Sequence, residues 1–167
     1  FFGAPNLPIV GTPGNDVLFG TIEDDTLQGL GGNDQVNGLG GADTMIGGPG
    51  DDRYFVDDPG DVVTELPGEG TDLLTTSIDF TLPANVENAN TNTTDPVNLT
   101  GNGLANRRNG HGAANSIIGL GGDDNLQGKA GIDVIIGGTG ADRLRGGTEA
   151  DTFIFGTGDG QGIGDTL

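Results

Sequence analysis

The sequence predicts an all-β fold: a parallel β-roll, or right-handed β-solenoid, made of 18-residue coils, with two roll blocks joined by a β-rich spacer. Three observations lead to this prediction. Aspartate or asparagine recurs every nine residues, a large apolar residue follows two positions later, and glycine-rich sequence separates successive units. A helical fold is excluded, because a nine-residue period does not fit a helical stripe and glycine is a poor helix former.

The first block follows an N-terminal extension of residues 1–9 and covers residues 10–55. Its units read GTPGNDVLF, GTIEDDTLQ, GLGGNDQVN, GLGGADTMI and GGPGDDRYF. The acidic residues at the sixth place of each unit are Asp16, Asp25, Asp34, Asp43 and Asp52. The apolar residues two positions later are Leu18, Leu27, Val36, Met45 and Tyr54.

Each unit divides into a turn and a strand. Six glycine-rich residues make the turn, because glycine tolerates positive φ and close backbone approach. The remaining three residues form a short strand whose central side chain points inward, since alternate strand residues face opposite sides. Two units therefore make one flat 18-residue coil, and stacked coils form parallel sheets around a thin apolar ladder.

The spacer, residues 56–100, loses the nine-residue period. Strands are predicted at 62–65, 73–76 and 78–82, between turn signals such as Asp58–Pro59–Gly60. The polar stretch from Asn88 to Asn98 is predicted to be a loop. Because the ends of a stack of coils are exposed edges, we expect the spacer to cover the first roll and to continue the stack towards the second.

The second block covers residues 101–155 and contains six units. Their sixth-place residues are Asn106, Asn115, Asp124, Asp133, Asp142 and Asp151. The apolar residues two positions later are Ile117, Leu126, Ile135, Leu144 and Phe153. Arg108 occupies the inward position of the first unit, so this unit is predicted to cap the second roll.

Residues 156–167 drift from the pattern and are predicted to begin a C-terminal cap. Asp159 and Asp165 could close a last cation site there. Because the chain begins at Phe1 without a methionine and ends abruptly, we expect it to be a fragment or a processed piece of a longer protein.

Stacking places every sixth-place aspartate above the one 18 residues later. Asp16, Asp34 and Asp52 then form one column, and Asp25 and Asp43 form another. Like charges at the spacing of neighbouring strands, about 5 Å, repel unless a cation lies between them. Calcium suits such a site, because it accepts six to eight oxygens from carboxylates and backbone carbonyls in flexible geometry. All eleven sixth-place residues of the two blocks are therefore candidate calcium ligands.

Counting neighbours on the same side gives three possible calcium sites in the first block and four in the second. About five of these seven sites should be well formed, because Asn106 and Asn115 are neutral ligands and give weaker sites. Glu23 and Glu149 replace the fourth-place glycine of their turns. We therefore expect five to seven calcium ions.

The composition excludes several classes of partner. The chain has 25 acidic residues against 6 basic ones and a formal net charge of −19, which argues against nucleic acid and anionic membrane surfaces. It has no cysteine for thiolate metal sites and no apolar stretch of transmembrane length, so we expect no membrane insertion by this segment. With 32% hydrophobic residues, folding needs periodicity, a counter-ion or both.

The units resemble the RTX, or hemolysin-type, calcium-binding nonapeptide-repeat family, whose consensus is GGxGxDxUx. The best copies are GLGGNDQVN, GLGGADTMI, GGTGADRLR and GLGGDDNLQ. The resemblance covers roughly residues 10–55 and 101–155, and the intervening stretch also looks like a spacer of that family. It implies calcium between same-side turns of successive coils, and a chain that folds only in calcium-rich surroundings outside a bacterial cell, after type I secretion or on the cell surface.

Catalysis is not expected of this chain. The single histidine, His111, lies in a turn and cannot supply a multi-histidine zinc site. Ser77 and Ser116 lack the G-x-S-x-G context of a hydrolase nucleophile. Paired carboxylates could serve glycoside hydrolysis, but their regular spacing favours a structural role.

Three functional hypotheses remain open from the sequence. The first is an extracellular calcium-binding module that serves secretion, stabilisation, adhesion or a surface layer. The second is a module of a larger secreted enzyme or toxin, such as a protease, lipase, epimerase or pore-former, whose neighbouring domains would lie outside this sequence. The third is a subunit that self-associates into an extracellular fibre.

Overall fold

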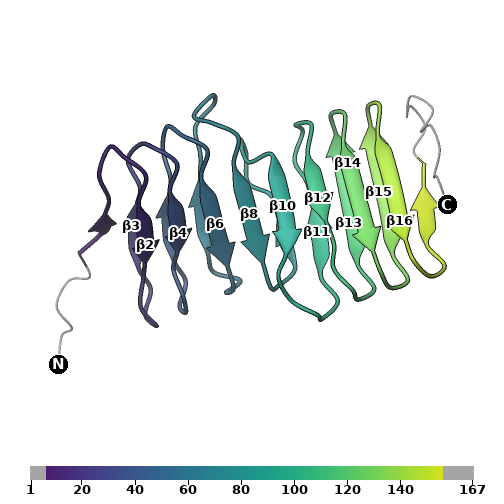
Figure 1. Ribbon diagram of the computed structural model, residues 1–167, viewed down its shortest axis with the longest axis horizontal. Coiled ribbons are helices and arrows are strands. Elements are labelled where there is room, and N and C mark those ends of the chain that lie inside the picture. The colour runs from purple at the N-terminus through teal and green to yellow at the C-terminus, as the bar shows by residue number, and fades with distance from the viewer. Residues whose placement is uncertain (1–6, 156–167) are drawn as a thin grey trace.

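The computed structural model describes residues 7–155, and every regular element in that part of the chain is a β-strand. The strands follow one another along the long axis of the molecule in chain order (Figure 1). All pairings between them are parallel, and they form three sheets of four, eight and five strands. This arrangement confirms the predicted all-β solenoid.

The eight-stranded sheet runs the whole length of the described stack. Its strands are β2 (Val17–Phe19), β4 (Gln35–Asn37), β6 (Arg53–Val56), β8 (Leu73–Thr76), β10 (Asn88–Thr91), β12 (Arg107–Asn109), β14 (Asn125–Lys129) and β16 (Arg143–Gly147). The opposite side of the roll is divided into two sheets. The four-stranded sheet holds β1 (Ile9–Val10), β3 (Thr26–Gln28), β5 (Thr44–Ile46) and β7 (Val62–Thr64). The five-stranded sheet holds β9 (Phe80–Thr81), β11 (Asn98–Thr100), β13 (Ser116–Gly121), β15 (Val134–Thr139) and β17 (Thr152–Ile154).

The register within each block follows the 18-residue coil. Leu18 pairs with Val36, and Leu126 pairs with Leu144, so residues at the same place of alternate units lie side by side. The inward residues Leu27, Val36, Met45 and Tyr54 are each 0% exposed. The apolar ladder predicted from the repeat is therefore the core of the roll.

The turns depend on glycine at their fourth place. Gly32 and Gly41 adopt φ values of 100° and 106°, in the left-handed region that residues with a Cβ rarely adopt. The predicted exception at Glu149 keeps this conformation, with φ of 72°, and its carboxylate Oε2 accepts a 2.7 Å hydrogen bond from the Gly131 N–H of the preceding coil.

The spacer continues the eight-stranded sheet, as predicted. The expected strands at 62–65 and 73–76 are present as β7 and β8, and the one at 78–82 shortens to β9. The predicted loop from Asn88 to Asn98 is wrong in its first part, because β10 pairs with β8 on one side and β12 on the other. Its inward residue is the small Ala89, 1% exposed, so this strand lacks the large apolar residue that marks the others.

The predicted cap at Arg108 is also wrong. Strand β12 pairs with both β10 and β14, so the stack passes through this position without interruption. The Arg108 side chain is 0% exposed and lies in line with the apolar ladder. It divides the core into one cluster that ends at Leu99 and another that begins at Ile117.

Candidate functional site

The sixth-place residues form two hydrogen-bonded columns, one on each edge of the roll. In the first column, the Asp16 N–H donates to Asp34 Oδ1 at 2.8 Å, and the Asp34 N–H donates to Asp52 Oδ1 at 2.7 Å. In the second column, the Asp25 N–H donates to Asp43 Oδ1 at 2.8 Å. Each carboxylate therefore reaches the backbone of the preceding coil on its own edge.

The second block repeats this arrangement. In the first column, Asp124 Oδ1 accepts from Asn106 and Asp142 Oδ1 accepts from Asp124, at 2.8 and 2.9 Å. In the second column, the equivalent bonds join Asn115, Asp133 and Asp151, again at 2.8 and 2.9 Å. All eleven predicted residues thus lie in the two columns that the repeat implies.

The second carboxylate oxygen of most of these aspartates has no partner. Among residues 7–155, six column aspartates hold a buried Oδ2 that makes no hydrogen bond: Asp34, Asp43, Asp52, Asp124, Asp133 and Asp142. A buried anionic oxygen without a donor costs free energy, so each of these atoms requires a proton or a cation.

The unpartnered oxygens lie beside glycine residues that leave room for them. A Cβ added to Gly29 would collide with Asp34 Oδ2 and with the carbonyl oxygen of Gly47. The same holds at Gly119, beside Asp124 Oδ2 and the Gly137 carbonyl. A carboxylate and a backbone carbonyl of the next coil thus meet at one small space, which is the donor set that calcium prefers.

Burial is the main electrostatic cost in the columns. It raises the pKa of Asp34, Asp43 and Asp133, and the carboxylates of neighbouring coils raise these values further. It raises the pKa of Asp52 and Asp124 to about 6, although hydrogen bonds from the backbone of the preceding coil oppose the shift. A divalent cation would relieve this cost by holding the carboxylates in their charged form.

The first coil differs from the rest. Asp16 Oδ2 accepts from the hydroxyl of Thr12 at 2.9 Å, and Asp25 Oδ2 accepts from the N–H and hydroxyl of Thr21 at 2.6 and 2.8 Å. These threonines occupy the second place of their turns. They supply donors to oxygens whose counterparts in six aspartates further along the roll have none.

The asparagines of the second block are also engaged. The Asn106 amide donates to the Glu87 carbonyl at 3.0 Å, while its Oδ1 accepts from the Arg108 guanidinium. Asn115 Oδ1 accepts from the Val97 N–H at 3.3 Å. The structure places both residues in the columns, and their role as calcium ligands stays a prediction.

Three residues extend the columns into the spacer and were not predicted from the sequence as ligands. Asp61 Oδ1 accepts from Asp43, Asp72 Oδ1 accepts from Asp52, and Glu87 Oε2 accepts from Asp72, at 3.0, 2.8 and 2.9 Å. Asp61 follows Asp52 by nine residues and precedes Val63 by two, so the period itself could have revealed it. The other two are hidden by changes in loop length.

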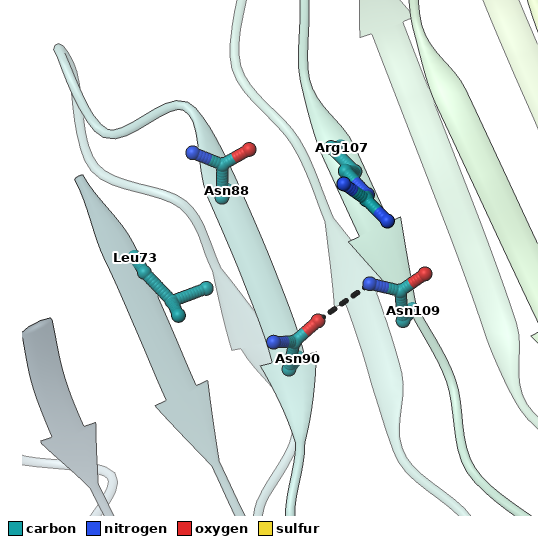
Figure 2. A pocket seen from close by; sticks show the side chains of 5 residues that line it. All are labelled: Leu73, Asn88, Asn90, Arg107 and Asn109. Carbon is teal, nitrogen blue, oxygen red and sulfur yellow. Dashed lines mark hydrogen bonds between the residues drawn. The ribbon is translucent and has the colours of Figure 1, made fainter. Parts of the chain in front are cut away.

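A shallow polar hollow of about 360 Å³ lies on the face of the eight-stranded sheet where it crosses the spacer. Figure 2 shows its lining, with Asn88 and Asn90 on β10 and Arg107 and Asn109 on β12. The Asn109 amide donates to Asn90 Oδ1 at 2.7 Å, which joins the two strands. These amides bond within the protein and do not converge on a common point.

The remaining sequence candidates do not assemble into a site. His111 lies in the turn before β13, Ser116 begins that strand, and Ser77 follows β8. Within the described part of the chain, no hydrogen bond joins the histidine to either serine. Asp159 and Asp165 lie outside the described residues. Residues 7–155 include no helix that is long and apolar enough to cross a membrane.

A family model made of four copies of the RTX calcium-binding nonapeptide repeat matches the chain over both blocks. The matched segments are residues 10–45, 19–54, 100–135, 118–153 and 127–161. This model describes a calcium-binding structural repeat and not a catalytic domain. A search of the curated proteins found no match.

Proposed function

Because the chain belongs to the RTX calcium-binding nonapeptide-repeat family, we propose that it is an extracellular calcium-binding β-roll module whose folding is coupled to calcium. The column residues are the proposed ligands, with backbone carbonyls of the turns completing each site. Residues 10–55 and 101–155 are the proposed calcium-binding blocks, and residues 56–100 join them.

The observation that carries this proposal is the set of six buried carboxylate oxygens without a hydrogen-bond partner. Each lies beside a glycine and faces its neighbours at the spacing of adjacent coils. Without cations these carboxylates either repel one another or take up protons, and both outcomes oppose folding at neutral pH. Calcium removes this cost, so binding energy becomes folding energy.

The overall charge supports the same coupling. Five to seven ions are expected, and seven would change the formal net charge from −19 to about −5, since each calcium ion carries two positive charges. The unfolded chain has only 32% hydrophobic residues to drive collapse. A low-calcium interior would therefore keep the chain unfolded, and calcium-rich surroundings outside the cell would fold it.

Such a switch suits a protein that is exported unfolded. The proposed biological role is to assist secretion, or to stabilise an adhesive or surface-layer protein after export. A larger secreted enzyme or toxin that carries this module is the alternative. The complete open reading frame distinguishes the two, because a catalytic or pore-forming domain beside the repeats would favour the alternative.

The direct test is a calcium titration of the chain followed by far-ultraviolet circular dichroism. We expect a disordered spectrum in chelator and a cooperative rise in strand signal at sub-millimolar to millimolar calcium, the range of extracellular sites. Magnesium at the same concentration is the control and should have little effect, because it retains its water and demands octahedral geometry. A folded spectrum in chelator would contradict coupled folding.

A further inference from the structure

A cluster of three buried carboxylates lies where the first block meets the spacer. It consists of Asp52, Glu65 and Asp72, which are 2%, 4% and 1% exposed. One ligand atom of each residue lies within 4.8 Å of the other two. Asp52 and Asp72 belong to the first column, whereas Glu65 follows β7 on the opposite side of the roll.

The break between the four- and five-stranded sheets brings Glu65 to this position. Strand β7 ends at Thr64 as the last strand of its sheet, and the chain next enters the opposite sheet at β8. The coil from Asp52 to Asp72 is 20 residues long, two longer than a regular coil. The Asn85 amide donates to the Glu65 carbonyl at 2.9 Å and fixes the backbone here.

Each carboxylate is anchored through one oxygen. Asp52 Oδ1 accepts from the Asp34 N–H at 2.7 Å, Asp72 Oδ1 accepts from the Asp52 N–H at 2.8 Å, and Glu65 Oε1 accepts from the Tyr54 hydroxyl. The other oxygens of Asp52 and Glu65, Oδ2 and Oε2, are buried and have no hydrogen-bond partner. The cluster is thus held rigidly by one set of oxygens and leaves a second set without donors.

We propose that Asp52, Glu65 and Asp72 bind one calcium ion in a junction site that the nine-residue repeat does not encode. The inference rests on the proposed function to the extent that Asp52 also belongs to a column, but Glu65 lies outside the repeat pattern. It adds a third carboxylate, from the opposite side of the roll, to a pair of turns that otherwise supplies two.

The donor set selects the ion. All three groups are hard oxygen donors, and no histidine or cysteine is among them, which disfavours zinc and the softer transition metals. Oxygens bound to one calcium ion lie at most about 5 Å apart, since each is 2.3–2.6 Å from the metal. The burial of all three carboxylates leaves little space for the water that magnesium retains, so calcium fits best.

The charged neighbours of Glu65 also favour a cation at this place. Burial, together with charge repulsion from Asp72, Asp52 and Glu69, raises the pKa of this carboxyl to about 8 against the hydrogen bond from Tyr54. All three of these charged neighbours are acids. The junction therefore gathers acidic groups in a buried place, and a bound cation would hold them in their charged form.

Tyr54 makes this site separately observable. It is the only tyrosine in the chain, there is no tryptophan, and its hydroxyl bonds directly to Glu65. Terbium is a hard trivalent cation that occupies calcium sites, and a nearby tyrosine sensitises its luminescence. Light absorbed by Tyr54 therefore reports on an ion at the junction much more strongly than on ions near the distant end of the second block.

The test compares Glu65→Gln with the matched control Glu69→Gln. Both remove one negative charge from the same loop, and each glutamine keeps a side-chain oxygen that can accept the native hydrogen bond, from Tyr54 or from the Leu66 N–H. Circular dichroism in calcium verifies the fold of both variants. Calorimetry should then count one calcium ion fewer for Glu65→Gln and the wild-type number for Glu69→Gln.

Terbium titration gives the second readout. We expect Glu65→Gln to weaken tyrosine-sensitised binding on the order of tenfold or more, a loss typical of altered metal shells, while Glu69→Gln behaves as wild type. An unchanged ion count and unchanged emission in Glu65→Gln would overturn the junction site. If the wild-type chain bound no calcium at all, the proposed function would fail instead.

Crystals of the wild-type chain grown in calcium test the site without any substitution. We expect an anomalous peak at calcium–oxygen distances from all three carboxylates. Peaks between the repeat turns with none at Glu65 would overturn the junction site and leave the repeat sites standing. This result stays decisive even if Glu65→Gln does not fold.

Discussion

The two ends of the spacer differ in the charged groups that they bury. Each places a polar residue in the otherwise apolar ladder: Tyr54 where the first block ends and Arg108 where the second begins, both 0% exposed. At the first end three buried acids meet, and the charged neighbours that act on Glu65 are themselves acids. At the second end a guanidinium lies among an asparagine and main-chain carbonyls.

The polar groups occupy equivalent places in their coils. A Cβ on Gly47 would meet the Tyr54 hydroxyl and Asp52 Oδ2, and a Cβ on Gly101 would meet the guanidinium of Arg108. The Arg108 guanidinium donates to the carbonyls of Ile118 and Gly119. These are main-chain oxygens of the next coil, the kind that we propose as calcium ligands elsewhere in the roll.

The charges of the two junctions differ accordingly. Burial lowers the pKa of Arg108 to about 10, and attraction to Asp124 opposes this shift, so the side chain stays protonated at neutral pH. The same attraction lowers the pKa of Asp124 against the larger effect of its burial. If the junction binds calcium as proposed, equivalent places in this fold take either an ion from solution or a cation built into the chain.

The largest effect should follow from removing the built-in cation. Arg108→Met keeps a long apolar side chain in the ladder but removes the guanidinium that donates to the Gly119 carbonyl and attracts Asp124. The Ile118 carbonyl also loses this donor and keeps only the bond from the Gly101 N–H. We expect the free energy of unfolding at low, sub-saturating calcium to fall by about 3–5 kcal/mol, as for a broken buried charge network. Chemical denaturation measures it.

Calcium should partly restore the stability of Arg108→Met if an ion from solution can replace the guanidinium. Saturating calcium would then restore more stability to Arg108→Met than to a control such as Arg143→Met, at an exposed position of β16. Equal losses for both variants, at low and at saturating calcium, would mean that Arg108 is not a substitute cation.

The dependence on pH should distinguish the apo and calcium-bound states. Burial and neighbouring acids raise the folded-state pKa of Glu65 to about 8 and of Asp52 and Asp72 to about 6. A raised carboxyl pKa stabilises the fold at pH below the unfolded value, and this contribution is lost as pH rises through the folded value. The apo roll should therefore lose stability between about pH 4 and pH 8.

The expected loss is a few kcal/mol, because one pKa unit corresponds to about 1.4 kcal/mol and Glu65 shifts most. With calcium the slope reverses, since ligands must be deprotonated to bind the ion. Thermal melts at pH 5 and pH 8, at low and at saturating calcium, measure both slopes. Parallel slopes in the two conditions would contradict the assignment of these carboxylates to calcium.

Periodicity explains why so much of this fold could be predicted. A repeated unit determines its turn, its strand and its inward residue together. The nine-residue period therefore predicts the column position of Asp34 and the burial of Val36. The prediction failed where the residue pattern departs from the nine-residue repeat. Ala89 and Arg108 replace the large apolar residue, and no local pattern shows that a neighbouring strand will still pair with theirs. Backbone hydrogen bonding to an existing sheet edge decides such strands.

Periodicity also made the candidate site predictable, but only for the residues that follow the repeat. The columns follow from the 18-residue coil, but Glu65 enters from the opposite side of the roll at a break between sheets. The amino-acid sequence around Glu65 is also typical of an exposed loop. Its burial depends on the 20-residue coil and on contacts with Tyr54 and Asn85, which only the three-dimensional structure reveals.

A smaller effect should follow from Tyr54→Phe. This change keeps the ring in the ladder and removes only the hydroxyl, so Glu65 loses its single hydrogen-bond donor. We expect a loss of about 1–2 kcal/mol at low, sub-saturating calcium, the usual cost of one buried unsatisfied group. The loss should shrink in saturating calcium, which thermal denaturation can compare directly. A larger loss with calcium than without it would contradict an ion bound by Glu65.

The smallest effects separate the two asparagines of the second block. Asn115→Asp adds a carboxylate to the second column beside Asp133, so we expect calcium affinity there to rise on the order of tenfold, because ligand charge tunes affinity. Asn106→Asp should leave calcium affinity nearly unchanged, because its Oδ1 lies on the Arg108 guanidinium and the added charge would pair with that cation. Calorimetric titration of both variants measures the difference. Equal gains in affinity would show that Arg108 does not occupy a cation position, and the contrast between the two junctions would then rest on Glu65 alone.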